Sequence, residues 1–229
     1  MQYWSVLSGE RVLVTGAAGR VGFPIARELA AEGNTVFGLA RYRDPAHRDK
    51  VLAVGIEPVA VDIHGATYDE LPDGITYVFH AGAALGPETA DWTRALETNA
   101  LSSGRLMRAV APTCLGFVYC STGSVYKYQG RRPLREDDQV RLGIRALEVA
   151  SVPALTVNWG GSETVSAEDY LAYAGSLLGV EPTITYGEGA YHPLWPDITK
   201  MHEVLGRCEV AWQDGFRRML EARVPDLLT

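Results

Sequence analysis

A glycine-rich turn between an expected strand and an expected helix is the feature that most constrains this chain. The apolar run Val12–Val14 is typical of a buried strand, and residues 23–33 show the pattern of a helix with Pro24 in its first turn. Glycines let a backbone approach a pyrophosphate, and the free N–H groups at a helix N-terminus face it. The sequence therefore favours a dinucleotide-binding turn over a purely structural one. Its expected contacts are Gly16, Gly19, Arg20, Val21 and Gly22.

Strands and helices alternate through the first half of the chain, which is typical of an α/β fold with a doubly wound parallel sheet. The expected strands are Arg11–Thr15, Thr35–Ala40, Glu57–Val61, Tyr77–His80 and Gly116–Cys120. The expected helices are Pro24–Glu32, Pro45–Val54 and Asp91–Ala111. We expect residues 1–140 to form a dinucleotide-binding domain.

Residues 141–229 are expected to form a reduced C-terminal α/β portion that packs on this domain. Ser166 and Asp169 have the spacing of a capping box, which predicts a helix over 167–178 that a glycine ends. A further helix is expected at 210–222, with an apolar stripe typical of core packing. Two short strands complete this portion: Ala154–Trp159 and Thr183–Tyr186.

Charge and composition argue against several classes of partner. The chain has 229 residues, a formal net charge of −7 and a pI near 5.3, which disfavour a nucleic-acid surface. It has no apolar run long enough to span a bilayer and no basic-then-apolar N-terminal segment, so we expect a cytoplasmic protein without a signal peptide. Its three cysteines have no metal-type spacing and are expected to be reduced thiols. A small-molecule substrate is the expected partner, and a homodimer is left open.

Ligands of an open parallel sheet sit outside the carboxyl ends of its strands. Arg41 and Arg43 follow the second strand, where a site that prefers NAD usually has a carboxylate. Two arginines suit a 2′-phosphate, so their charge favours NADP, with NAD as the alternative and solvated surface residues as the plainer interpretation. Asp62 and Ile63 follow the third strand and are candidates for an adenine contact, with a simple loop cap as the alternative for Asp62.

The fourth and fifth strands end in small and hydroxyl-bearing residues. Three small residues after the fourth strand let a ligand approach the backbone: Ala81, Gly82 and Ala83. His80, at the end of that strand, is more typical of a packed core histidine than of a catalyst. Thr122 and Tyr126 follow the fifth strand at the expected mouth of the crevice, and they are the candidate catalytic groups.

In this order and spacing, the motifs resemble those of the NAD-dependent epimerase/dehydratase family, the extended short-chain dehydrogenase/reductases. The matching segments are 15–22, 62–63, 80–83, 98–99 and 121–126, and residues 156–168 resemble the family's C-terminal part. The resemblance implies a Rossmann-like fold, an NAD(P) cofactor and oxidoreductase-type chemistry. It also implies that Thr122 occupies the catalytic Ser/Thr position, that Asn99 has a mainly structural role, and that Tyr126 is a packing or substrate-side residue.

The catalytic pair of the family is missing from this chain. Members that transfer hydride use a Tyr-x-x-x-Lys pair, in which the tyrosine is the acid/base and the lysine lowers its pKa. No tyrosine stands four residues before any of the three lysines, Lys50, Lys127 and Lys200. By comparison with the family, the block that would hold this pair and a sixth strand is absent. Because an open sheet edge is normally covered, we expect residues 154–159, or a second chain, to pair with the fifth strand.

Three functions remain open from the sequence. The first is an oxidoreductase or epimerase acting on a small polyol, nucleotide sugar or ketone, in which Tyr126 or Tyr128 beside Lys127 replaces the lost tyrosine. The second is a non-redox enzyme, such as a lyase, isomerase or cyclase, that uses the same crevice. The third is a non-catalytic nucleotide-binding or regulatory paralogue. The substrate itself is not readable, because the segment that would define it is the one that is missing.

Overall fold

A computed structural model describes residues 7–122, 136–187 and 196–228. The chain divides into two compact units. The first consists of Met1–Cys120 and Gly143–Leu155, and the second of Ser121–Leu142 and Thr156–Thr229. The expected boundary after residue 140 falls inside helix α5 (Glu136–Glu148), whose C-terminal turns belong to the first unit.

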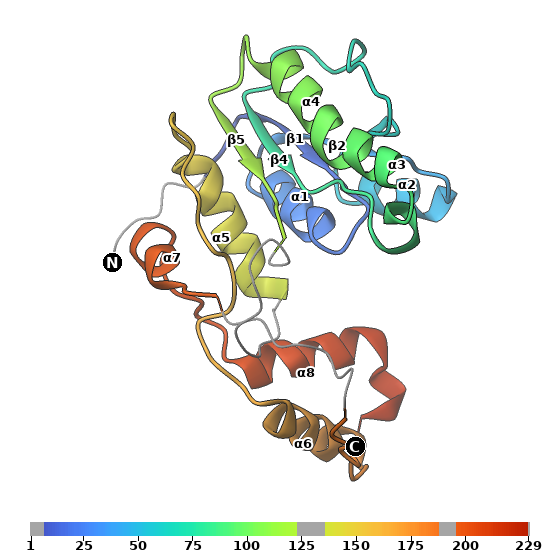
Figure 1. Ribbon diagram of the computed structural model, residues 1–229, viewed down its shortest axis with the longest axis vertical. Helices are drawn as coiled ribbons and strands as arrows, with labels where there is room; N and C mark the ends of the chain where they lie inside the picture. The colour runs from blue at the N-terminus through green and yellow to red at the C-terminus, as the bar shows by residue number, and fades with distance from the viewer. Residues whose placement is uncertain (1–6, 123–135, 188–195, 229) are drawn as a thin grey trace. The chain divides into compact units, whose positions relative to one another are not determined.

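The first unit is built on a five-stranded sheet in which every pairing is parallel (Figure 1). Its strands are β1 (Arg11–Thr15), β2 (Thr35–Ala40), β3 (Glu57–Ala60), β4 (Tyr77–His80) and β5 (Gly116–Tyr119). They lie in the order β3-β2-β1-β4-β5. The chain therefore reverses its direction of winding between β1 and β4, which is where a doubly wound sheet opens a crevice for a ligand. The predicted α/β architecture with a parallel sheet is confirmed.

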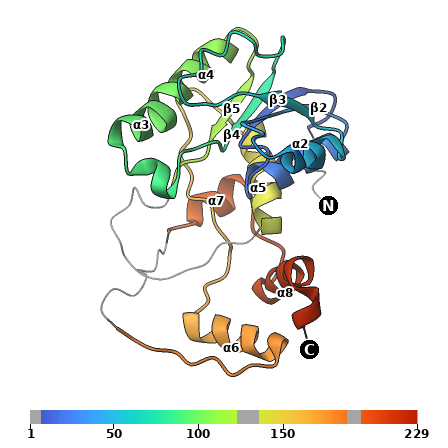
Figure 2. The ribbon, with the colours of Figure 1, turned by 90° about the vertical axis from the view of Figure 1, so that its right-hand side faces the viewer.

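Helices cover both faces of this sheet. They are α1 (Gly22–Ala31), α2 (Pro45–Leu52), α3 (Trp92–Leu96) and α4 (Ser102–Val110), with short turns η1 (Gly86–Thr89) and η2 (Glu97–Leu101). Figure 2 shows α3 and α4 along one side of the strands. Leu106 and Val110 of α4 pack there against Leu13, Phe37 and Val78 of the central strands. This apolar layer holds α4 against the central strands of the sheet.

The opposite face receives α1 and the last turns of α5. A Cβ atom built on Gly143 would lie 3.0 Å from Ile25 of α1 and 3.1 Å from Phe79 of β4. Glycine at this position therefore lets α5 approach the sheet closely. This contact explains why the first unit takes in residues beyond the predicted boundary.

The helix expected over 91–111 is interrupted. Asp91 caps α3 by accepting the N–H of Arg94 at 3.1 Å, and the helix then widens into the π-helical turn η2 before α4 begins. An amphipathic pattern does not reveal one extra residue in a turn, so the sequence predicted a continuous helix. Turns of this kind are frequently found at functional sites.

The strands expected at Ala154–Trp159 and Thr183–Tyr186 do not form, and pairing of the first of them with β5 is wrong. Polar groups of residues 154–159 are held by the chain around α7 (Thr199–Val204) instead. Lys200 Nζ donates to the carbonyl of Thr156 at 2.7 Å, and Asn158 Nδ2 donates to the carbonyl of Asp197 at 2.8 Å. Residues 154–156 are exposed, so no buried apolar face favours a strand there.

The second unit contains α6 (Ala167–Leu178), α7, α8 (Trp212–Arg223) and η4 (Pro225–Leu227). Ser166 caps α6 as predicted, because its Oγ accepts the N–H of Asp169 at 2.9 Å. The rings of Trp212 and Phe216 on α8 pack against Tyr173 and Tyr170 of α6, with centroids 5.1 and 4.7 Å apart. The apolar stripe of the last helix is therefore packing surface, as its pattern predicted.

Candidate cofactor site

The turn after β1 requires glycine at two positions. Gly16 has a φ of 69°, a left-handed conformation that glycine adopts without strain. Its N–H donates to the carbonyl of Leu39 at 2.9 Å, which ties the turn to the end of β2. A Cβ atom on Gly22 would lie 2.4 Å from the carbonyl oxygen of Gly16, so only glycine lets α1 start this close to the turn.

The beginning of α1 is open to an anion. Its N-cap residue is Val21, whose apolar side chain makes no capping hydrogen bond. Gly19 and Arg20 are exposed directly before it. The Phe23 N–H donates to the carbonyl of Gly19 at 3.1 Å and Pro24 has no N–H, so it is the positive dipole end of the helix beside the exposed Gly19 and Arg20 that suits this position to a phosphate.

The loops after β1, β3 and β4 converge on Gly82. A Cβ atom there would lie 3.0 Å from Thr15 Oγ1 and 3.3 Å from Ile63 Cδ1. In the same way, a Cβ atom on Gly16 would lie 3.1 Å from the carbonyl carbon of Ala81. The predicted small residues therefore form a cradle that side chains would fill, and Ala83 is exposed beside it. These residues fit a dinucleotide that passes close to the backbone.

His80 lies beneath this cradle in a relay of hydrogen bonds. The N–H of Gly82 donates to Thr15 Oγ1 at 2.8 Å, and Thr15 Oγ1 lies 2.6 Å from His80 Nδ1. His80 Nε2 lies 2.8 Å from Ser103 Oγ, which donates to the carbonyl of Asn99 at 3.1 Å. All contacts are satisfied when Thr15 donates to Nδ1 and the neutral ring donates from Nε2.

Burial keeps the His80 ring neutral. The side chain is 1% exposed, and this desolvation lowers its pKa to about 4. The ring also packs against Phe117 and Tyr119 of β5, with centroids 6.0 and 5.5 Å away. His80 is therefore a packed core histidine, as its sequence context indicated, and it also links β1, β4 and α4.

Asn99 clamps the loop that follows the cradle. From the π-helical turn η2, its Oδ1 accepts the N–H of Ala84 at 2.7 Å and its Nδ2 donates to the carbonyl of Ala84 at 3.1 Å. Its own carbonyl also accepts the hydroxyl of Tyr119 at 3.1 Å. These contacts hold backbone in place, and they support the structural role that the family resemblance implied.

Each arginine after β2 already has a carboxylate partner. Arg41 Nη1 lies 2.5 Å from Glu88 Oε1, and Arg43 Nη2 lies 3.4 Å from Asp62 Oδ2. Between them, Tyr42 has a φ of 44°, and its hydroxyl donates to the carbonyl of Gly38 at 2.6 Å. Burial of the Tyr42 phenol raises its pKa to about 12. Glu88 was not predicted, because nothing in its short Gly86–Thr89 turn marks it in the sequence.

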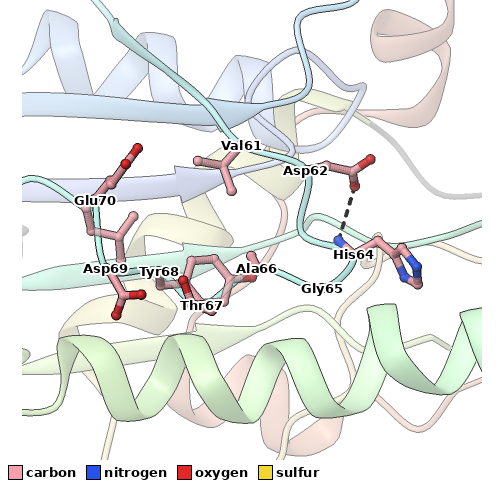
Figure 3. A pocket seen from close by; sticks show the side chains of 10 residues that line it. Val61, Asp62, His64, Gly65, Ala66, Thr67, Tyr68, Asp69 and Glu70 are labelled. Atoms are coloured by element: carbon pink, nitrogen blue, oxygen red, sulfur yellow. Dashed lines mark hydrogen bonds between the residues drawn. The ribbon is translucent and has the colours of Figure 1, made fainter.

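The segment after β3 borders an open cavity of about 340 Å³ (Figure 3). Asp62 Oδ1 accepts the N–H of His64 at 3.1 Å, so this carboxylate caps the loop, which was the plainer interpretation of it. The lining also includes the carboxylates of Asp69 and Glu70, which disfavour a phosphate. The cavity is therefore less suited to the pyrophosphate than the turn after β1.

The catalytic roles expected of Thr122 and Tyr126 stay predictions. Thr122 is exposed and falls in the second unit. Tyr126, Lys127 and Tyr128 lie outside the described residues. In the part of the chain that the structure describes, no group of three His, Cys, Asp or Glu side chains could hold a metal ion, and no helix is long and apolar enough to cross a bilayer.

The parallel sheet with its switch point, glycine cradle and uncapped helix defines a dinucleotide-binding α/β fold. The sequence model of the NAD dependent epimerase/dehydratase family matches residues 12–143. The chain belongs to this NAD-dependent family, and the predicted family is therefore confirmed.

Comparison with known proteins gives relatives that act on UDP-linked sugars. The UDP-N-acetyl-alpha-D-glucosaminuronate decarboxylase of Bacillus cytotoxicus is 25% identical over 189 residues, which are 80% of this chain and 56% of that protein. This chain thus spans little more than half the length of that relative.

Solved structures share the fold. The UDP-glucuronic acid 4-epimerase of Bacillus cereus, in complex with UDP-glucuronic acid and NAD, has a TM-score of 0.75 at 18% identity, covering 90% of this chain and 96% of its own. The UDP-glucose-4-epimerase of Stenotrophomonas maltophila, with bound NAD and formylated UDP-arabinopyranose, has a TM-score of 0.73 at 15% identity, with coverages of 91% and 96%.

Proposed function

We propose that this chain binds a nicotinamide dinucleotide at the carboxyl ends of β1, β2 and β4. The observation that carries the proposal is the close packing of Gly22 on Gly16, which brings the uncapped start of α1 to the end of β1. In this proposal the turn from Gly16 to Gly22 holds the pyrophosphate, Asp62 and Ile63 lie at the adenosine, and the loop over 81–83 faces the remainder of the cofactor. When bound, the nicotinamide would supply a hydride donor or acceptor.

Chemistry on a nucleotide sugar is the second candidate. It is favoured by the names of two similar proteins, the decarboxylase and one epimerase, because both names include a UDP-linked uronic acid. Both are enzymes, and this favours an enzymatic role over a regulatory one. It is opposed by the absence of a Tyr-x-x-x-Lys pair from all 229 residues. Dinucleotide binding without standard hydride turnover therefore accounts best for the chain.

Fluorescence titration with NADH tests the binding proposal. Gly19→Asp puts a carboxylate against the expected pyrophosphate, where a Cβ atom meets only the carbonyl oxygen of Gly16 at 3.0 Å, and we expect it to abolish binding. Gly104→Asp is the matched control, because a Cβ atom there meets nothing within 4 Å, and it should bind like the wild type. Failure of the wild type to bind either NADH or NADPH, or normal binding by Gly19→Asp, contradicts the proposal.

Turnover is tested separately. Conversion of UDP-glucuronic acid in the presence of NAD, followed by chromatography of the nucleotide sugars because epimerisation leaves no net NADH, should stay at the level of a reaction without protein, since the sequence has no Tyr-x-x-x-Lys pair. Turnover well above that level would establish the second candidate and show that another group acts as the acid/base.

A further inference from the structure

Glu88 holds the arginine on which a preference for NADP would depend. The Arg41 guanidinium donates from Nη1 to Glu88 Oε1 at 2.5 Å, and the two side chains are 40% and 35% exposed. Arg41 follows β2, whereas Glu88 lies in the turn η1 beyond β4. The pair therefore spans the edge of the crevice at which the adenosine ribose would lie.

Tyr42 separates the two arginines and gives each a different partner. Its left-handed backbone and its hydrogen bond to Gly38 hold the ring against β2. Arg41 then contacts the loop beyond β4, and Arg43 contacts Asp62 beyond β3. Each guanidinium is therefore paired with a carboxylate. A 2′-phosphate that binds at this edge would have to compete with these carboxylates for the two arginines.

The Glu88 carboxylate also interacts with the positive charges of the arginines near it. Its hydrogen bond from Arg41 lowers its pKa, and the nearby charges of Arg94 and Arg43 act in the same direction. Its carboxylate is therefore ionised at neutral pH. Removal of this one negative charge would leave Arg41 unpaired and the edge positively charged.

We propose that Glu88 is a specificity-determining residue that makes the chain prefer NAD to NADP. This inference rests on the proposed dinucleotide binding. A 2′-phosphate must displace Glu88 from Arg41, and its negative charge is repelled by the Glu88 carboxylate. A 2′-hydroxyl carries no charge and can instead donate a hydrogen bond to that carboxylate. Exposed ion pairs add little to stability, so a variant of Glu88 should change cofactor binding without unfolding the chain.

The test compares dissociation constants for NADH and NADPH in the intact chain by fluorescence titration. The wild type should bind NADH more tightly. Glu88→Gln should tighten NADPH binding about tenfold and change NADH binding less than about threefold, as expected for the loss of one screened charge. Adding Arg41→Ala to Glu88→Gln should remove the gain, because the freed guanidinium would be its source.

Glu97→Gln is the matched control. It breaks the partly buried pair of Glu97 in η2 with Arg105 in α4, and it should leave both constants unchanged. Binding of NADH with no NADPH gain in Glu88→Gln overturns this inference alone. A wild type that prefers NADPH also overturns it, whereas binding of neither dinucleotide by any variant overturns the proposed function together with it.

Discussion

Thr15 Oγ1 lies 2.6 Å from Nδ1 of His80, and the same hydroxyl oxygen accepts the N–H of Gly82 at 2.8 Å. One buried hydroxyl thus joins the end of β1, the end of β4 and the first loop of the proposed cofactor site. The loop that contains Gly82 is therefore anchored to buried residues of β1 and β4, so changes to these residues should alter cofactor binding.

Thr15→Val should destabilise the protein by about 1–3 kcal/mol, because it leaves the Gly82 N–H and the His80 ring nitrogen without partners in a buried place. Urea unfolding measures the change. Thr15→Ser keeps the hydroxyl and should recover most of it, and Thr35→Val, at an exposed position of β2, should shift stability by less than about 0.5 kcal/mol. An equal effect of the valine and serine variants at position 15 would show that the hydroxyl is unimportant.

The lowered pKa of His80 leads us to expect a loss of folding stability in mild acid. Its folded pKa of about 4 is below the ordinary 6.5, so the unfolded chain binds the proton more readily between these values. The stability present above pH 6.5 should fall by about 3 kcal/mol as the pH drops to 4.

The acid effect is measured by urea unfolding across this pH range. His80→Asn keeps an acceptor toward Thr15 and should flatten the curve, although it weakens packing. His47→Asn, at an exposed position of α2, should retain the wild-type slope. A slope unchanged in His80→Asn would mean that other groups cause the acid loss.

Gly22→Ala should disrupt the turn, because the new Cβ would lie 2.4 Å from the backbone oxygen of Gly16, which cannot move without displacing the turn. We expect loss of NADH binding by titration together with a lower unfolding midpoint. Gly104→Ala, in an exposed part of α4, should instead stabilise by about 0.5–1 kcal/mol. Wild-type binding by Gly22→Ala would show that the turn tolerates a wider opening.

Ser166→Ala tests the second unit independently of the cofactor. Loss of the cap on Asp169 N–H should cost about 1 kcal/mol, read as a lower thermal midpoint. Ser176→Ala is the control, since its hydroxyl is exposed and donates to the Tyr173 carbonyl on the same helix rather than to a helix end. Equal midpoints for the two variants would contradict a stabilising cap.

The sequence correctly predicted the strands and helices whose local residue pattern matches the burial they have in the fold. β1, β2 and β4 have the predicted bounds, because their apolar runs are buried on both faces. The capping serine and left-handed Gly179 likewise define α6 from local chemistry. The strand expected at 154–159 failed because an apolar run forms a strand only where a partner and a buried face are supplied. Here the Lys200 side chain of α7 donates to the carbonyl of Thr156, and the Asn158 side chain donates to the carbonyl of Asp197 before α7.

The sequence predicted the positions of the site at which only glycine fits the backbone. It did not predict the side-chain contacts between residues that are far apart in the sequence. Gly16, Gly22 and Gly82 lie together as expected. Arg41 was recognised as a charge at the ribose edge, but its contact with Glu88 joins residues 47 positions apart, and no periodicity reveals it. Ser103, the partner of His80, was missed for the same reason.

The most direct test of dinucleotide binding is an amide chemical-shift titration of the isotope-labelled chain with NADH. We predict saturable shifts of the amide signals of Gly16, Gly19 and Gly22 and of Gly82, with smaller changes in α6 and α8. Shifts confined to the second unit or to the loop lined by Asp69 and Glu70, or no shifts at all, would contradict a cofactor site at the turn after β1.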